Sequence, residues 1–278
     1  MINSYLNHQL FLFTLLIPMV IFSSCEDKLV EDSQADKEFK SFTRMHAIDT
    51  DVILWPQETY TEENQVPVLQ LNFQTTKIYP CINFGIALTQ EVDENTLIIR
   101  FDSIIRHQIC LTAIGPASGG IPIAENIQQL VLVNGDEIDR YDLFISSEKV
   151  SLTPSDTSFT QIEANTWFRY PENSFAFICG TNTDNIQHCS DFYSILIDSL
   201  DVKPFNFQGK GVIPYPVSSS GHWNDNSTQF FTYADIEEFK KAGALLEAYT
   251  QDKIIPNSGV TLQLLNWKNQ HYLSWMMQ

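Results

Sequence analysis

Short runs in which apolar and polar residues alternate recur between Val66 and Thr153. They are rich in Val, Ile and aromatic side chains, and Asp, Asn, Gly and Pro separate them, as in strands joined by turns. The predicted strands are Val66–Phe73, Cys81–Leu88, Asn95–Ile104, Gln128–Gly135, Tyr141–Ser146 and Lys149–Thr153. Because no helical period intervenes, we predict a mainly β fold that begins with an immunoglobulin-like antiparallel β-sandwich.

One segment inside this region breaks the alternation. Ile109–Ile123 mixes glycines and prolines with apolar residues, which favours a long, bent connection over a strand. A phosphate-binding loop is the alternative interpretation of the glycines. That loop needs a following helix whose N-terminus faces the anion, and no helical pattern follows here.

The pattern changes after the turn-rich segment Thr153–Ser158. The strands predicted beyond it are Ser174–Cys179, Asp191–Asp198, Gly259–Trp267 and His271–Met276, the last two as a hairpin. Ser218–Asn226 is predicted to be a loop. The second half therefore combines strands with the single predicted helix described next.

Only one stretch in this half has a clear helical period. Its apolar stripe consists of Ile236, Phe239, Ala242 or Gly243, Leu246 and Tyr249. Thr232 is the predicted N-cap, with Asp235 as its capping-box partner. Glu237 and Lys241 lie one turn apart on the polar side. We therefore predict a small α+β domain in which one amphipathic helix covers an antiparallel sheet.

The start of the chain has the features of an export signal. Leu10–Phe22 is almost wholly apolar, but it is shorter than the roughly twenty residues that a bilayer-spanning helix needs. Ser23 and Ser24 follow, and then Cys25. This arrangement resembles the lipobox of bacterial lipoproteins. The resemblance implies that Cys25 is acylated and becomes the new N-terminus, which anchors the chain in a membrane.

An acidic segment follows the cysteine. Residues 26–40 contain six carboxylates and three lysines with few apolar groups, so they are expected to form a disordered tether. The start of this segment is similar to the acidic signal of Bacteroidota lipoproteins. The resemblance implies an outer-membrane location, with the protein exposed at the cell surface or, alternatively, facing the periplasm.

These patterns predict four parts of the chain. They are a signal peptide (1–24), an acylated cysteine with its tether (25–44), a β-sandwich domain (45–155) and an α+β domain (156–278). The formal net charge of -18 excludes nucleic acid as a partner, because binding to phosphates relies on clustered Lys and Arg.

Cysteine usage agrees with an exported protein. Apart from Cys25, the chain has Cys81, Cys110, Cys179 and Cys189, an even number that is typical of disulfides outside the cytosol. Three pairings exist, and we favour Cys81 with Cys110 and Cys179 with Cys189 because each pair lies within one predicted domain. Free buried thiols and a zinc site are the alternatives, and the CxxC spacing of zinc sites is absent.

Candidate catalytic groups gather in one segment. The loop 218–226 offers hydroxyls, a carboxylate and His222, but it lacks the G-x-S-x-G pattern of a nucleophile elbow. Asn134–Asp142 is rich in acids without the spacing of a calcium loop, so a solvated turn is favoured. We therefore predict no metal and no cofactor.

Tryptophans provide the remaining candidate for function. Trp55, Trp223, Trp267 and Trp275 are expected in loops or near strand ends, where exposed rings stack on sugars; burial in a core is the alternative. The candidate ligand-binding residues are Trp55, His222 and Trp223. We predict a non-catalytic binding or accessory module whose partner is a glycan or an envelope protein. The alternative is an extracytoplasmic hydrolase that uses the loop 218–226.

The lipid anchor leads to a direct prediction. A Cys25→Ser chain lacks the sulfur that carries the acyl chains, so the protein should leave the membrane fraction. Cell fractionation and intact-protein mass spectrometry measure location and acylation. A Cys25→Ser chain that fractionates like the unaltered one would contradict the prediction.

Overall fold

The structure is a computed structural model that describes residues 47–60, 65–219 and 221–277. The predicted signal peptide, Cys25 and the tether up to residue 44 lie outside the described residues. Within the described ranges, no helix is long and apolar enough to span a bilayer.

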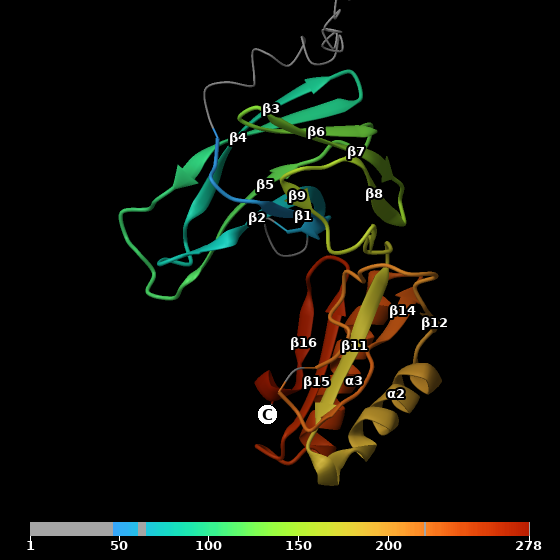
Figure 1. Cartoon of the computed structure of the whole chain (residues 1–278). Helices are drawn as coiled ribbons and strands as arrows, with labels where there is room; N and C mark the ends of the chain where they lie inside the picture. The colour runs from blue at the N-terminus through green and yellow to red at the C-terminus, as the bar shows by residue number, and fades with distance from the viewer. Residues whose placement is uncertain (1–46, 61–64, 220, 278) are drawn as a thin grey trace, which may run out of the picture. The chain divides into compact units, whose positions relative to one another are not determined.

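The first half of the described chain forms one large mixed sheet that curls on itself (Figure 1). Its strands are β1 (Val52–Thr59), β2 (Val68–Tyr79), β3 (Gly85–Asp93), β4 (Thr96–Ile105), β5 (Gly115–Pro122), β6 (Gln129–Asn134), β7 (Glu137–Ile145), β8 (Lys149–Asp156), β9 (Thr160–Gln161) and β10 (Thr166–Phe168). Their spatial order is β10-β8-β7-β6-β4-β3-β5-β2-β1-β9. Most neighbours are antiparallel, whereas β1–β9, β3–β5 and β4–β6 are parallel.

The inner face of the curled sheet encloses the core. Alternate side chains of β1, among them Val52 and Leu54, are fully buried there, while Ile53 and Trp55 face outward. Phe101 makes edge-to-face contacts with Phe73 and Phe159, with ring centroids 5.2 and 5.7 Å apart. Along β1 the sheet thus has one apolar face and one face that is free to carry other groups.

A buried carboxylate on β7 holds the segment after β8 next to β1. Asp139 on β7 accepts hydrogen bonds from Ser158 N and Oγ at 2.6 and 2.9 Å. It also accepts from Phe159 N at 3.1 Å, from Thr160 N at 2.7 Å and from the Thr160 hydroxyl. These bonds satisfy a side chain that has no exposed surface and place β9 parallel to β1.

The second half contains a smaller antiparallel sheet with two helices (Figure 1). Its elements are β11 (Ser174–Thr181), a 3₁₀ turn (Thr183–Asn185), α2 (Gln187–Ser199), β12 (Val202–Phe205), β13 (Asn224–Asp225), β14 (Gln229–Tyr233), α3 (Ile236–Lys253), β15 (Val260–Asn266), β16 (His271–Leu273) and a second 3₁₀ turn (Ser274–Met276). The spatial order is β12-β14-β11-β15-β16, with β13 added to β11.

Strand β11 is buried along its whole length because both of its faces are covered. Phe175 and Phe177 belong to the cluster that contains the apolar residues of α2 and α3. Ala176 and Ile178, on the opposite face, pack in a second cluster with Tyr215 and partly buried side chains of the 205–213 segment. Because both faces of this strand are covered, its sequence is a continuous apolar run and does not alternate.

The predicted helix exists as α3, although its cap differs. Asp235, not Thr232, is the N-cap, and its carboxylate accepts from Glu237 N at 3.1 Å. Thr232 lies in β14 instead. The ion pairs also follow another spacing, since Glu237 contacts Lys240 and Glu238 contacts Lys241.

Two segments differ from their predicted structure. Asp191–Asp198 lies within α2 rather than in a strand, because Cys189, Phe192 and Leu196 form a buried helical stripe. The expected connection Ile109–Ile123 contains β5. A Cβ at Gly119 would come within 3.2 Å of the Ile86 carbonyl oxygen, so glycine permits the close approach of neighbouring strands.

The mainly β fold and both predicted disulfides are present in the structure. Cys81–Cys110 joins the β2–β3 and β4–β5 connections, and Cys179–Cys189 joins β11 to α2, with Cα atoms 5.3 and 5.7 Å apart. The large sheet continues beyond residue 155, because β9 and β10 pair with it. The smaller part has two helices where one was expected.

The Asp139 network predicts a large stability difference between two similar substitutions. Asp139→Asn replaces one acceptor oxygen by an NH₂ group that faces backbone donors, so unfolding should become easier by about 3 kcal/mol. Asp142→Asn is the control on the same strand, because Asp142 is exposed, and it should change stability by less than about 0.5 kcal/mol. Urea unfolding measures both. Equal effects of the two substitutions would contradict the role given to Asp139.

Candidate functional site

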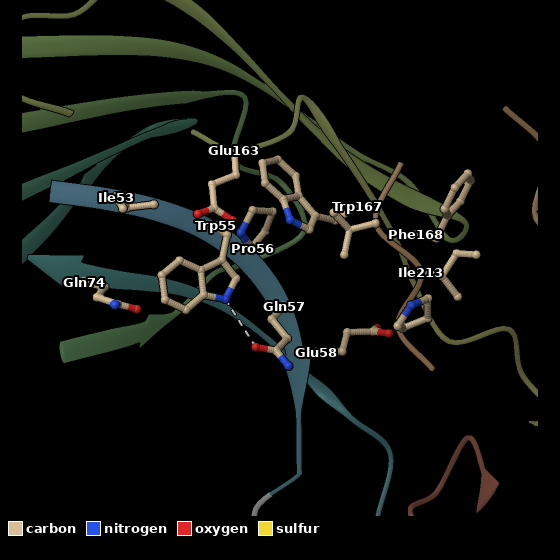
Figure 2. A pocket seen from close by; sticks show the side chains of 12 residues that line it. Ile53, Trp55, Pro56, Gln57, Glu58, Gln74, Glu163, Trp167, Phe168 and Ile213 are labelled. Carbon is tan, nitrogen blue, oxygen red and sulfur yellow. Dashed lines mark hydrogen bonds between the residues drawn. The ribbon is translucent and has the colours of Figure 1, made fainter. Parts of the chain in front are cut away.

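A hollow of about 340 Å³ lies on the outward face of β1 (Figure 2). Trp55 and Gln57 alternate with buried residues along β1, so their side chains emerge on this face. Gln74 joins them from β2, because it is paired with Ile53 in the sheet register. Glu163 follows β9, which is the strand on the other side of β1. The sheet register therefore gathers these side chains from β1, from β2 and from the segment after β9.

The hollow combines a large aromatic surface with a few polar groups. The half-buried Trp55 ring is held by a hydrogen bond from its Nε1 to Gln57 Oε1 at 3.3 Å. In Figure 2, Gln57, Gln74 and Glu163 surround this ring, and Trp167 lines the hollow beside them. Amides supply donors and acceptors, and a carboxylate supplies acceptors. An aromatic wall with few convergent polar groups is a general property of small-molecule sites.

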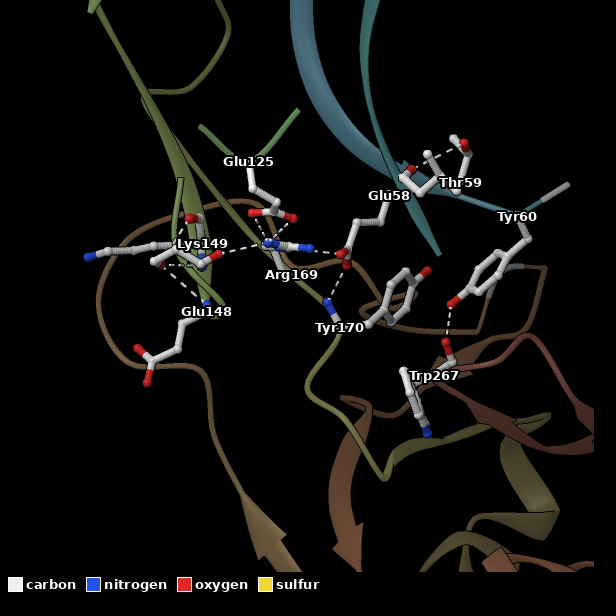
Figure 3. Close-up of polar contacts among 11 residues, drawn as sticks. Glu58, Thr59, Tyr60, Glu125, Glu148, Lys149, Arg169, Tyr170 and Trp267 are labelled. Atoms are coloured by element: carbon white, nitrogen blue, oxygen red, sulfur yellow. Dashed lines mark hydrogen bonds and ion pairs between the residues drawn. The ribbon is translucent and has the colours of Figure 1, made fainter. Parts of the chain in front are cut away.

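Glu58, which also lines this hollow, belongs to a buried ion pair (Figure 3). Its carboxylate accepts from Arg169 Nε at 2.9 Å and from Tyr170 N at 2.7 Å. Arg169 Nη1 donates to Glu125 at 2.9 Å and to the Ser146 carbonyl oxygen at 3.0 Å. Burial disfavours the charged guanidinium, but the hydrogen bond and charge of Glu58 outweigh it and raise the pKa of Arg169.

Tyrosine side chains extend this network toward the smaller sheet. The Tyr60 hydroxyl donates to the Trp267 carbonyl oxygen at 2.6 Å, and the Tyr170 hydroxyl donates to the Pro214 carbonyl oxygen at 2.8 Å. Burial raises the pKa of Tyr60, and the neighbouring Tyr170 and Glu58 raise it further. The pKa of Tyr170 is also raised, first by burial. Both phenols are therefore neutral hydrogen-bond donors at neutral pH.

A wider hollow of about 720 Å³ lies beside the same ion pair. Its aromatic lining consists of Phe168, Tyr170, Phe205, Phe207 and Trp267. Charged groups of both signs, among them Glu148, Lys149 and Glu172, border it. Neither hollow is lined by His222 or Trp223.

His222 lies in a separate cluster of hydroxyls. Ser219 Oγ is 3.2 Å from His222 Nδ1, and Thr261 Oγ1 is 3.2 Å from His222 Nε2. The ring packs over Gly180, where a Cβ would come within 2.5 Å of Nδ1. Trp223 is 84% exposed beside it. The structure therefore separates His222 and Trp223 from Trp55.

Sequence reasoning found Trp55 but missed the residues that surround it. Gln57, Gln74, Glu163 and Trp167 become neighbours only through the pairing of β1 with β2 and β9 and the position of β10. The alternation of buried and outward residues along β1 was the one available signal. Trp267, expected near a strand end, is buried.

The acid-rich segment Asn134–Asp142 spans the β6–β7 turn, and its Asp139 accepts hydrogen bonds from Ser158 and from Thr160 at the start of β9. Across the described ranges, no group of three or more His, Cys, Asp or Glu side chains is arranged to hold a metal ion.

Comparison with known protein families, with curated proteins and with solved structures finds no match to this chain. Its function must therefore be argued from the geometry of its own sites.

Proposed function

We propose that this chain is a non-catalytic ligand-binding module whose hollow around Trp55 binds a sugar ring of an envelope or extracellular glycan. One observation carries the proposal: a half-buried indole ring, fixed by Gln57, stands among the amides of Gln57 and Gln74 and the carboxylate of Glu163. The apolar face of a sugar ring packs on such an indole, while its hydroxyls exchange hydrogen bonds with amides and carboxylates.

The second part of the proposal concerns location. We infer that acyl chains on Cys25 hold the protein in the outer membrane, at the cell surface or, alternatively, on the periplasmic side. The apolar run before Ser23 and the acidic tether after Cys25 support this part. A tethered binding module would retain a glycan near the membrane without changing it chemically.

The geometry at His222 favours binding over hydrolysis. A serine nucleophile needs a histidine that takes its proton and a third group, usually a carboxylate, that orients the histidine and stabilises its charged form. Here Nε2 faces the neutral hydroxyl of Thr261. The 3.2 Å contact between Ser219 and His222 is the one observation that favours the hydrolase alternative.

A binding measurement tests the hollow directly. The unaltered protein is applied to a glycan array, and its affinity for the strongest glycan is measured by calorimetry. Trp55→Ala removes the stacking surface and should weaken binding about tenfold or more. Trp223→Ala is the matched control, because it removes an exposed indole outside the hollow, and it should leave the affinity unchanged. Loss of binding in Trp223→Ala but not in Trp55→Ala would contradict the proposal.

The same samples distinguish a hydrolase from a binding module. Mass spectrometry of the glycan after long incubation should show an unchanged mass with the unaltered protein. Shortened products that disappear in Ser219→Ala would establish catalysis at the His222 cluster and refute the non-catalytic assignment.

A further inference from the structure

Exposed aliphatic side chains gather around the Cys81–Cys110 disulfide. The connections β2–β3 and β4–β5, which this bond joins, carry most of them. We call this the aliphatic surface, and its members are Ile78, Ile82, Ile105, Ile109, Leu111 and Ile114. Ile109 and Ile114 are 77% and 72% exposed. A gathered set of this kind marks an interaction site, unlike single exposed apolar residues.

The backbone that carries these side chains is held in place. Asn83 Nδ2 donates to the Ile109 carbonyl oxygen at 2.7 Å, and Asn83 Oδ1 accepts from Leu111 N at 3.2 Å. Ile82 N donates to the Ala113 carbonyl oxygen at 2.6 Å. Together with the disulfide, these bonds hold the backbone so that the aliphatic side chains stay exposed to water. Exposing apolar surface to water costs free energy, and contact with an apolar phase would remove that cost.

The charge pattern of these segments differs from that of the rest of the protein. The chain has 34 Asp and Glu residues, but none lies in 77–90 or 103–124. Arg106 and His107 are exposed within the β4–β5 connection, and Lys77 pairs with Asp49 nearby. The acids at the end of β3 lie opposite Thr96, at the far end of the β3–β4 hairpin. At about 3.3 Å per residue, that end is more than 20 Å from Ile105 and the aliphatic surface.

We propose that the aliphatic surface docks on a phospholipid bilayer, with Ile109, Leu111 and Ile114 in the upper acyl region and Arg106 at the phosphate level. Carboxylates are repelled by anionic headgroups, so the acid-free segments are the part of this acidic protein that can approach them.

The position of the proposed anchor is compatible with this contact. Fully extended, the chain from Cys25 to Ala47 reaches at most about 75 Å, so a lipid on Cys25 would keep the body within reach of the same bilayer. The docking would add a second attachment that sets the orientation of the protein. It goes beyond the binding of a glycan and does not depend on the hollow around Trp55.

Photo-crosslinking to lipid tests the proposal with the full chain. The protein is reconstituted into vesicles of equal parts phosphatidylcholine and phosphatidylglycerol that contain a phosphatidylcholine with a diazirine in its acyl chain. After illumination, mass spectrometry maps the lipid adducts. We expect adducts on peptides that contain Ile109, Leu111 and Ile114. Adducts confined to the segment before residue 47 would overturn the proposal.

Two variants make the result specific. The triple variant Ile109→Ser, Leu111→Ser and Ile114→Ser should reduce adducts on these peptides about tenfold, and circular dichroism checks that it is folded. Phe144→Ser is the matched control, because it removes an exposed apolar side chain of β7 outside the aliphatic surface, and it should change nothing. Equal adduct levels in the triple variant and the unaltered chain would overturn the proposal.

A charge variant and a second cross-linker complete the test. Arg106→Glu should lower the adducts on vesicles with phosphatidylglycerol more than on vesicles of phosphatidylcholine alone. A protein cross-linker is also attached at Lys77 and used in native envelopes. If it captures one abundant protein and no lipid adducts form on this surface, the proposal is overturned in favour of a protein partner.

Discussion

The buried contact between Glu58 and Arg169 is the constraint on which the arrangement of the candidate site depends. The two side chains are only 5% and 16% exposed, so both charges have lost most of their water. Such a loss is tolerable only where every charged atom has a partner. Here the carboxylate accepts from Arg169 and from Tyr170 N, and the guanidinium also reaches Glu125 and Ser146. The pair thus ties the end of β1 to the segment that leaves β10 for the smaller sheet, and both hollows lie against it.

The sequence predicted those elements whose signals are local. Alternating runs between turn residues identified six strands of the large sheet, and the stripe from Phe239 to Tyr249 identified α3. Helix α2 was missed because part of its buried stripe, Cys189, lies in a polar stretch. Strand β5 was missed because its glycines serve the close approach of neighbouring strands, which only the folded sheet explains. In both cases, tertiary contacts determine which secondary structure the segment adopts.

The candidate site shows the same division. Trp55 was recognisable as a residue that can stack on a ligand, but its position within β1 was not. The partners of Trp55 come from β2 and from the segment after β9, and strand pairing alone makes them neighbours. His222 and Trp223 are adjacent in sequence and lie outside both hollows, since Gly180 and Thr261 hold the imidazole against the smaller sheet. Residue type was therefore predictable, whereas the combination of residues required the register of the sheets.

A double-mutant cycle at the ion pair tests this account most directly. Glu58→Gln, Arg169→Met and the double variant are compared with the unaltered protein by urea unfolding. Each single substitution leaves a buried partner unsatisfied, so we predict a loss of about 3 kcal/mol for each. The double variant should lose much less than the sum, with a coupling of about 2 kcal/mol or more. Additive losses, with a coupling below about 0.5 kcal/mol, would show that the contact does not hold this region together and would contradict the account.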